Sequence, residues 1–320
     1  MRKVAKFIRL FILGVVFSLI LSGCISMANQ SNGTNSRSEE KIQIVATIAQ
    51  IGEPMQIIGG DRVEVKSLMG PGVDPHLYKA TQGDISTLQN ADIILCSGLH
   101  LEGNMGEIFS KLSESKATFA LGESIDESLL LKDEGGAIDP HIWFDLDIWK
   151  EALEKATEEL KNYSPKDADY FEENKQQYFS QIDDLKADAL HQLSRIPKDQ
   201  RVLVTAHDAF GYFGKMFEIE VVGLQGLSTE DEVGLSDIQS TVDLLIEKQV
   251  PAVFVESSIN QNSIQAVIEG ASKAGLNVKL GGELFSDAMG KEGTEEGTYL
   301  GMYRHNVDTI YHALTSGDES

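Results

Sequence analysis

The sequence has 320 residues, a formal net charge of −23 and 42% hydrophobic residues. So negative a chain is a poor partner for nucleic acid or anionic lipid headgroups, because like charges repel. The length allows two domains, and the apolar content is sufficient for the core of each.

Residues 1–23 are typical of a secretory signal peptide, because four basic residues precede an uncharged apolar run at positions 10–21. That run is shorter than the roughly 20 residues that a membrane-spanning helix needs. It ends in Leu21-Ser22-Gly23-Cys24, which is similar to the lipobox of bacterial lipoproteins. We expect Cys24 to be acylated and to anchor the mature chain in the membrane. The alternative is an ordinary signal peptide whose cysteine is incidental.

Residues 24–40 are rich in Ser, Asn and Gly and predict a flexible tether. From residue 41 onward, short β-branched runs alternate with amphipathic stretches. The predicted strands are residues 42–47, 63–68, 91–97 and 117–121, and then 201–205, 220–223, 252–255 and 278–280, with helices between them such as 235–248 and 261–274. This alternation predicts an α/β fold with two lobes, residues 41–163 and 197–320, each built on a parallel sheet with helices on both faces.

Residues 164–196 predict one long helix between the two lobes. Ser164 and Pro165 suit its first positions, and no Gly or Pro follows until Pro197. Apolar residues recur there at spacings of three and four. Thirty helical residues extend about 45 Å, which suits a rigid backbone helix that runs along both lobes. The alternative is two shorter helices with a kink.

Three histidines and one aspartate stand out as candidate metal ligands: His76, His141, His207 and Asp287. Ligands of open α/β sheets bind beyond the carboxyl ends of the strands, and His76, His207 and Asp287 all follow such strands. Three imidazoles and a carboxylate form a plausible shell for zinc, with manganese as the alternative. His76 and His141 both occur as Asp-Pro-His, in which proline restricts the preceding aspartate.

Five acidic residues near these positions are candidates for a supporting role: Asp74, Asp139, Asp145, Asp208 and Glu256. A carboxylate that accepts the outer N–H of a ligating imidazole sets the tautomer of that imidazole. Each aspartate is equally well placed to be a turn residue. If Asp287 did not bind metal, Glu256 would be the candidate general base of a zinc hydrolase.

The motifs Asp74-Pro-His76-Leu-Tyr, Asp139-Pro-His141-Ile-Trp, His207-Asp-Ala-Phe-Gly-Tyr-Phe and Ser286-Asp287-Ala-Met together resemble the zinc- and manganese-binding solute-binding lipoproteins of ABC transporters. The resemblance implies two α/β lobes joined by a long helix, with the metal held between the lobes by His76, His141, His207 and Asp287. It also implies an exported monomer that is lipid-anchored outside the cytoplasmic membrane, is not an enzyme, and delivers its metal to a membrane permease.

Two departures from the pattern of this family leave the identity of the metal undecided. Manganese-binding relatives often carry glutamate at the third ligand position, where this chain has His207. Zinc-binding relatives often carry a histidine-rich loop, but residues 113–138 contain no histidine. Two other functions remain as alternatives: a zinc-dependent hydrolase, and a surface adhesin with a structural metal. Four protein ligands close a zinc shell, which favours capture over catalysis.

Overall fold

The computed structural model describes residues 40–230 and 232–315. The predicted signal peptide, Cys24 and nearly all of the tether lie outside the described residues. Within residues 41–320 the chain forms one compact unit. No helix of the described residues is both long enough and apolar enough to cross a membrane.

The first lobe, called the N-lobe here, is built on a four-stranded parallel sheet in the order β2-β1-β3-β4. Its strands are β1 (Ile42–Ala46), β2 (Val63–Ser67), β3 (Ile93–Cys96) and β4 (Ala117–Ala120), and its helices are α2 (Ala49–Gly59), α3 (Gln82–Asn90), α4 (Gly106–Ser113) and α5 (Leu146–Tyr163). The central strand β3 is buried along its whole length, as its apolar sequence predicts.

The second lobe, called the C-lobe here, repeats this alternation with two parallel pairs, β5-β6 and β7-β8, in which β5 lies beside β7. Its strands are β5 (Val202–His207), β6 (Glu220–Gln225), β7 (Ala252–Glu256) and β8 (Lys279–Leu284), and its helices are α7 (Gly211–Phe217), α8 (Leu235–Lys248), α9 (Asn262–Lys273) and α10 (Tyr299–Thr315). The prediction of two α/β lobes with parallel sheets is confirmed.

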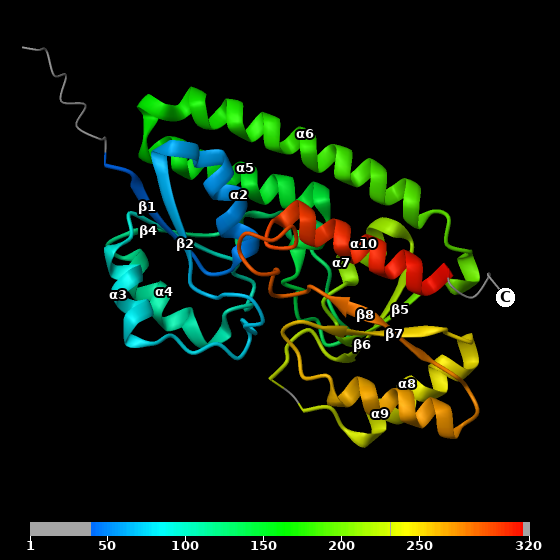
Figure 1. The fold of residues 1–320 in the computed structure, drawn as a ribbon. Coiled ribbons are helices and arrows are strands. Elements are labelled where there is room, and N and C mark those ends of the chain that lie inside the picture. Colours follow the sequence, from blue (N-terminus) through cyan, green and yellow to red (C-terminus); the bar gives the residue numbers. More distant parts are fainter. Residues whose placement is uncertain (1–39, 231, 316–320) are drawn as a thin grey trace, which may run out of the picture. The chain divides into compact units, whose positions relative to one another are not determined.

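The long helix α6 (Ala168–Leu193) packs against α2 and α5 of the N-lobe and against α10 of the C-lobe (Figure 1). A short 3₁₀ turn, Pro165–Asp167, precedes it. Its buried face consists of Phe171, Lys175, Tyr178, Ile182, Leu185, Ala189 and Leu193. Its 26 residues span about 39 Å at 1.5 Å per residue. The helix is continuous, so the alternative of two helices with a kink was wrong.

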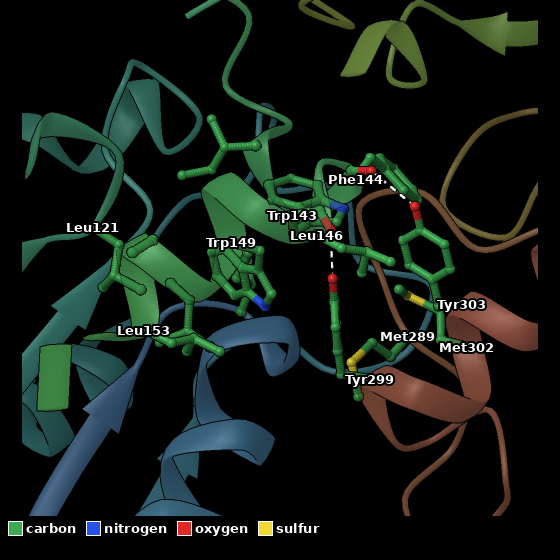
Figure 2. Packing of buried hydrophobic residues seen from close by; sticks show 14 of the residues in the cluster. Leu121, Trp143, Phe144, Leu146, Trp149, Leu153, Met289, Tyr299, Met302 and Tyr303 are labelled. Atoms are coloured by element: carbon green, nitrogen blue, oxygen red, sulfur yellow. Dashed lines mark hydrogen bonds between the residues drawn. The ribbon is translucent and has the colours of Figure 1, made fainter. Parts of the chain in front are cut away.

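The larger hydrophobic core contains residues of both lobes and of α6. Figure 2 shows its aromatic centre, where Trp143, Phe144 and Trp149 of the N-lobe face Tyr299 and Tyr303 of α10. All five side chains are fully buried, and burying one large apolar side chain contributes about 1.5–3 kcal/mol. The two lobes therefore share one packed interior on the side of α6.

Candidate metal centre

His76 lies in the loop that follows β2 and is held at its backbone. Its N–H donates to Asp74 Oδ1 at 2.9 Å, which closes a short turn around Pro75. Its carbonyl accepts from Asn104 Nδ2 at 3.0 Å. The imidazole is buried, with 3% of the residue exposed. Proline and the two hydrogen bonds thus restrict this loop to one path.

His141 is held by Asp139 from the same Asp-Pro-His motif. Asp139 Oδ1 lies 2.7 Å from His141 Nδ1 and also accepts the backbone N–H of His141 at 2.9 Å. Tyr212 of the C-lobe donates to the carbonyl of Asp139 at 3.0 Å. The indole of Trp143 packs edge-on against the imidazole, with 5.3 Å between ring centroids. Asp139 fixes Nδ1 as the protonated nitrogen, so Nε2 is the nitrogen available to a metal.

His207 is the last residue of β5, which runs two residues further than predicted. Its partner is Glu256, the last residue of β7. Glu256 Oε1 accepts the backbone N–H of His207 at 2.8 Å, and Oε2 lies 2.6 Å from His207 Nδ1. The side chains of both residues are fully buried. Glu256 therefore faces the Nδ1 side of the His207 imidazole as an ion-pair partner, and Nε2 points toward Asp287.

Asp287 lies in the loop after β8 and faces all three imidazoles. Its Oδ1 is 3.3 Å from His141 Nε2, and its Oδ2 is 3.2 Å from His207 Nε2 and 3.7 Å from His76 Nε2. Gln50, in α2 of the N-lobe, donates to the carbonyl of Ser286 at 3.1 Å. The loop that carries Asp287 is thus fastened across the lobes.

The four side chains form one group whose ligand-type atoms all lie within 4.8 Å of one another. The three Nε2 atoms and both oxygens of Asp287 are buried, and none makes a hydrogen bond within the described part of the chain. Buried polar atoms are rarely left unpartnered. Ligands at 2.0–2.2 Å from a tetrahedral ion stand roughly 3.3 Å apart, close to the nitrogen–oxygen distances found here. The donor set and its spacing therefore fit a first-row divalent metal.

Burial and neighbouring charges shift the pKa of each of the three histidines. Burial lowers the pKa of His76 to about 4, with a further lowering from the two neighbouring imidazoles. Burial also opposes the charged form of His141, but Asp139 and Asp287 outweigh it and raise its pKa to about 9. For His207 burial is outweighed by Glu256 and Asp287, which raise the pKa well above its usual value.

Asp287 has the opposite shift. Burial would raise its pKa, but the imidazoles of His207 and His141 hold it well below its ordinary value. At neutral pH Asp287 is therefore ionised, and His141 and His207 carry protons. A divalent cation bound by these side chains would have to replace those protons, because coordination requires a free Nε2.

The remaining acidic candidates have other partners. Asp74 Oδ2 accepts from the hydroxyl of Thr229 at 2.6 Å. Asp145 caps α5 by accepting from the N–H groups of Asp147 and Ile148. Asp208 lines a cavity against β6 and α8, and burial raises its pKa. Sequence reasoning missed Gln50, Tyr212 and Thr229, because nothing local in the sequence shows that they contact the ligand loops.

A second acidic group, Glu154, Glu158 and Glu172, is close enough together to hold an ion. Lys161 lies 2.7 Å from Glu158 and 3.0 Å from Glu172, and Lys175 lies 2.6 Å from Glu154. The three carboxylates are paired with two lysines, so they form a salt-bridge network on α5 and α6.

Two α/β lobes spanned by a long helix, with four ligand-type side chains enclosed between them, define the class of two-lobed metal-binding solute-binding proteins. A family model described as zinc-uptake complex component A, periplasmic, matches residues 44–313. This chain belongs to that family.

Individual relatives agree with this assignment. The manganese-binding lipoprotein MntA of Bacillus subtilis (strain 168) is 47% identical over 295 residues, which cover 92% of this chain and 95% of the relative. The zinc-binding protein TroA of Treponema pallidum (strain Nichols) is 45% identical over 280 residues, covering 88% and 91%. The solved structure of the periplasmic zinc-binding protein TroA from Treponema pallidum matches with a TM-score of 0.84, covering 86% of this chain and 99% of that one. The manganese ABC transporter substrate-binding lipoprotein PsaA of Streptococcus mitis is 29% identical over 309 residues, covering 94% and 98%.

Proposed function

We propose that this protein captures one divalent transition metal ion outside the cytoplasmic membrane and passes it to the permease of an ABC transporter. The observation that carries the proposal is the enclosed group of three Nε2 atoms and one carboxylate, none of which has a hydrogen-bond partner among residues 40–230 and 232–315. The names of the relatives, which describe zinc-binding, manganese-binding and ABC-transporter proteins, support the same reading. His76, His141, His207 and Asp287 are the proposed ligands.

Zinc is the proposed tighter cargo, with manganese as the alternative. Affinity for nitrogen-rich sites rises from manganese toward zinc, and three of the four proposed ligands are imidazoles. Both oxygens of Asp287 face imidazoles, so a bidentate Asp287 would give the five-coordinate shell that manganese also accepts. Which metal the protein carries in the cell then depends on which metal is available and which one the permease accepts.

A catalytic role is the weaker alternative. A catalytic zinc keeps one position open for water, whereas four protein side chains converge here and at most 3% of any of the four residues is exposed. We also propose that the chain is a monomer, that Cys24 carries the lipid anchor, and that the lobes divide at residues 41–163 and 197–320 around the helix of 164–196.

Uptake and binding assays test the proposal together. Cells that lack the gene are expected to regain accumulation of radioactive zinc or manganese when the wild-type chain is expressed. They are not expected to regain it with His141→Ala, which removes a ligand from a loop. The purified wild-type chain should bind one zinc ion and His141→Ala far less. Uptake that is fully restored by His141→Ala, in spite of weakened binding, would contradict delivery through this site.

A further inference from the structure

Several hydrogen bonds that hold the ligand loops cross between the lobes, among them those of Tyr212 with Asp139 and of Gln50 with Ser286. On the side of the shared core, the hydroxyls of Tyr299 and Tyr303 donate to the carbonyls of Trp143 and Phe144, at 2.6 and 2.8 Å (Figure 2). These groups are buried in the aromatic core that follows His141. This side offers no path for an ion.

On another side of the site lie the loop that carries His76 and the loop that carries Thr229. His76 is the most exposed of the four proposed ligands, at 3%, whereas His141 and His207 are at 0%. Its neighbour Leu77 is 51% exposed. Of the four proposed ligands, His76 therefore lies nearest to solvent.

One cross-lobe hydrogen bond closes this exposed side. Thr229, in the loop between β6 and α8 of the C-lobe, donates from Oγ1 to Asp74 Oδ2 at 2.6 Å. The other oxygen of Asp74 accepts the backbone N–H of His76. The carboxylate of Asp74 thus joins a C-lobe hydroxyl to the backbone of a proposed ligand. Thr229 is 7% exposed and Asp74 is partly exposed, so this hydrogen bond lies at the edge of the site.

The loop of His76 also passes close to the C-lobe at Gly72. Gly72 has a positive φ of 71°, and a Cβ placed there would lie 3.5 Å from the carbonyl oxygen of Ser257. Outward movement of His76 together with Asp74 would break the hydrogen bond between Thr229 and Asp74.

We propose that Thr229 is a positioning residue: its hydroxyl holds Asp74, and through it His76, against the C-lobe and thereby limits the rate at which the metal leaves. The inference rests on the proposed metal site. The hydrogen bond between Thr229 and Asp74 forms only when the lobes are together. Removing the Thr229 hydroxyl is therefore expected to raise the rate of metal dissociation more than it lowers the rate of metal binding. The expected change is about tenfold, equivalent to about 1.4 kcal/mol, which is near the lower end for a hydrogen bond to a charged group.

Three substitutions in the full-length chain separate the effect of losing the Thr229 hydroxyl from the effect of changing the packing around it. Thr229→Val removes the hydroxyl and keeps the shape, and Thr229→Ser keeps the hydroxyl. Thr241→Val is the matched control, since the Thr241 hydroxyl bonds only to the Asp237 carbonyl, within α8 of the C-lobe. Each protein is loaded with Zn²⁺ and mixed with excess 4-(2-pyridylazo)resorcinol, and the dissociation rate is read from absorbance.

Thr229→Val is expected to release zinc about tenfold faster than wild type, with Thr229→Ser and Thr241→Val within about twofold of it. A rate for Thr229→Val within twofold of wild type would overturn the proposal, and so would a Thr229→Ser rate equal to that of Thr229→Val. If Thr229→Val fails to fold, Thr229→Ala gives the same comparison. A wild-type chain that binds no zinc refutes the proposed function instead, so the two failures are distinguishable.

Discussion

Glu256→Gln is expected to weaken zinc binding about 10- to 100-fold without removing any proposed ligand. Glu256 Oε1 accepts the backbone N–H of His207, and Oε2 forms an ion pair with Nδ1 of the imidazole at 2.6 Å. Glutamine has the same shape but offers one acceptor and one donor. Whichever way its amide turns, its NH₂ group opposes one of the two N–H groups of His207.

The size of the effect follows from that mismatch. Losing an outer carboxylate typically costs 10- to 100-fold in metal affinity, equivalent to about 1.4–2.7 kcal/mol. Burial adds to the cost, because Glu256 is 1% exposed and water cannot replace the lost acceptor. The variant is also expected to lower the pKa of His207, since Glu256 is the largest of the influences that raise it.

The assay is competition of metal-free protein with a zinc chelator of known affinity. Asp145→Asn is the control, because Asp145 caps α5 and contacts the N–H groups of Asp147 and Ile148. It is expected to lower the free energy of unfolding by up to about 1 kcal/mol and to leave zinc affinity unchanged. A dissociation constant for Glu256→Gln within twofold of wild type would refute the role given to Glu256.

Four further outcomes are expected. Tyr299→Phe should lower the free energy of unfolding by about 1–3 kcal/mol, because it leaves the buried carbonyl of Trp143 without its partner; an unchanged denaturant midpoint would contradict this. Zinc binding at pH 7 should release about two protons, because His141, with a pKa of about 9, and His207 are protonated in the metal-free site while His76, with a pKa of about 4, is neutral. The affinity should therefore fall as the pH falls, and calorimetry in buffers of different ionisation enthalpy that detects no proton release would count against the assigned charges. Equimolar zinc should displace manganese from the protein in a competition titration, and the reverse result would overturn the preference for zinc. Mass spectrometry of the membrane fraction should find Cys24 acylated at the mature N-terminus, and an unmodified Cys24 there would rule out the lipid anchor.

The main elements of the fold were predictable because their signals are local. Apolar runs such as that of β3 and the three-and-four spacing along α6 depend on neighbouring residues alone. Strand ends were less well placed: β5 continues to His207, and its final N–H bonds to the carboxylate of Glu256. That contact joins residues 49 positions apart, so the sequence near β5 does not reveal it.

The supporting carboxylates show where sequence reasoning stopped. Asp74 and Asp139 stand in the same Asp-Pro-His motif, and each accepts the N–H of its histidine at 2.9 Å. Only Asp139 is described in contact with the imidazole, while Asp74 turns to Thr229, which is 155 positions away. The Asp-Pro-His motif determines the local turn. What else the aspartate carboxylate contacts depends on residues that only the tertiary fold brings near, such as Thr229 for Asp74. For Asp145 a local signal was present, since an aspartate directly before an amphipathic helix is a common N-cap.

The central claim is that one metal ion is held between the lobes by four side chains. Anomalous diffraction from crystals of the zinc-loaded protein, recorded on both sides of the zinc edge, tests it most directly. We expect one peak per chain within about 2.0–2.2 Å of Nε2 of His76, His141 and His207 and of at least one oxygen of Asp287. A peak elsewhere, or one whose fourth ligand is water with Asp287 turned away, would contradict the account.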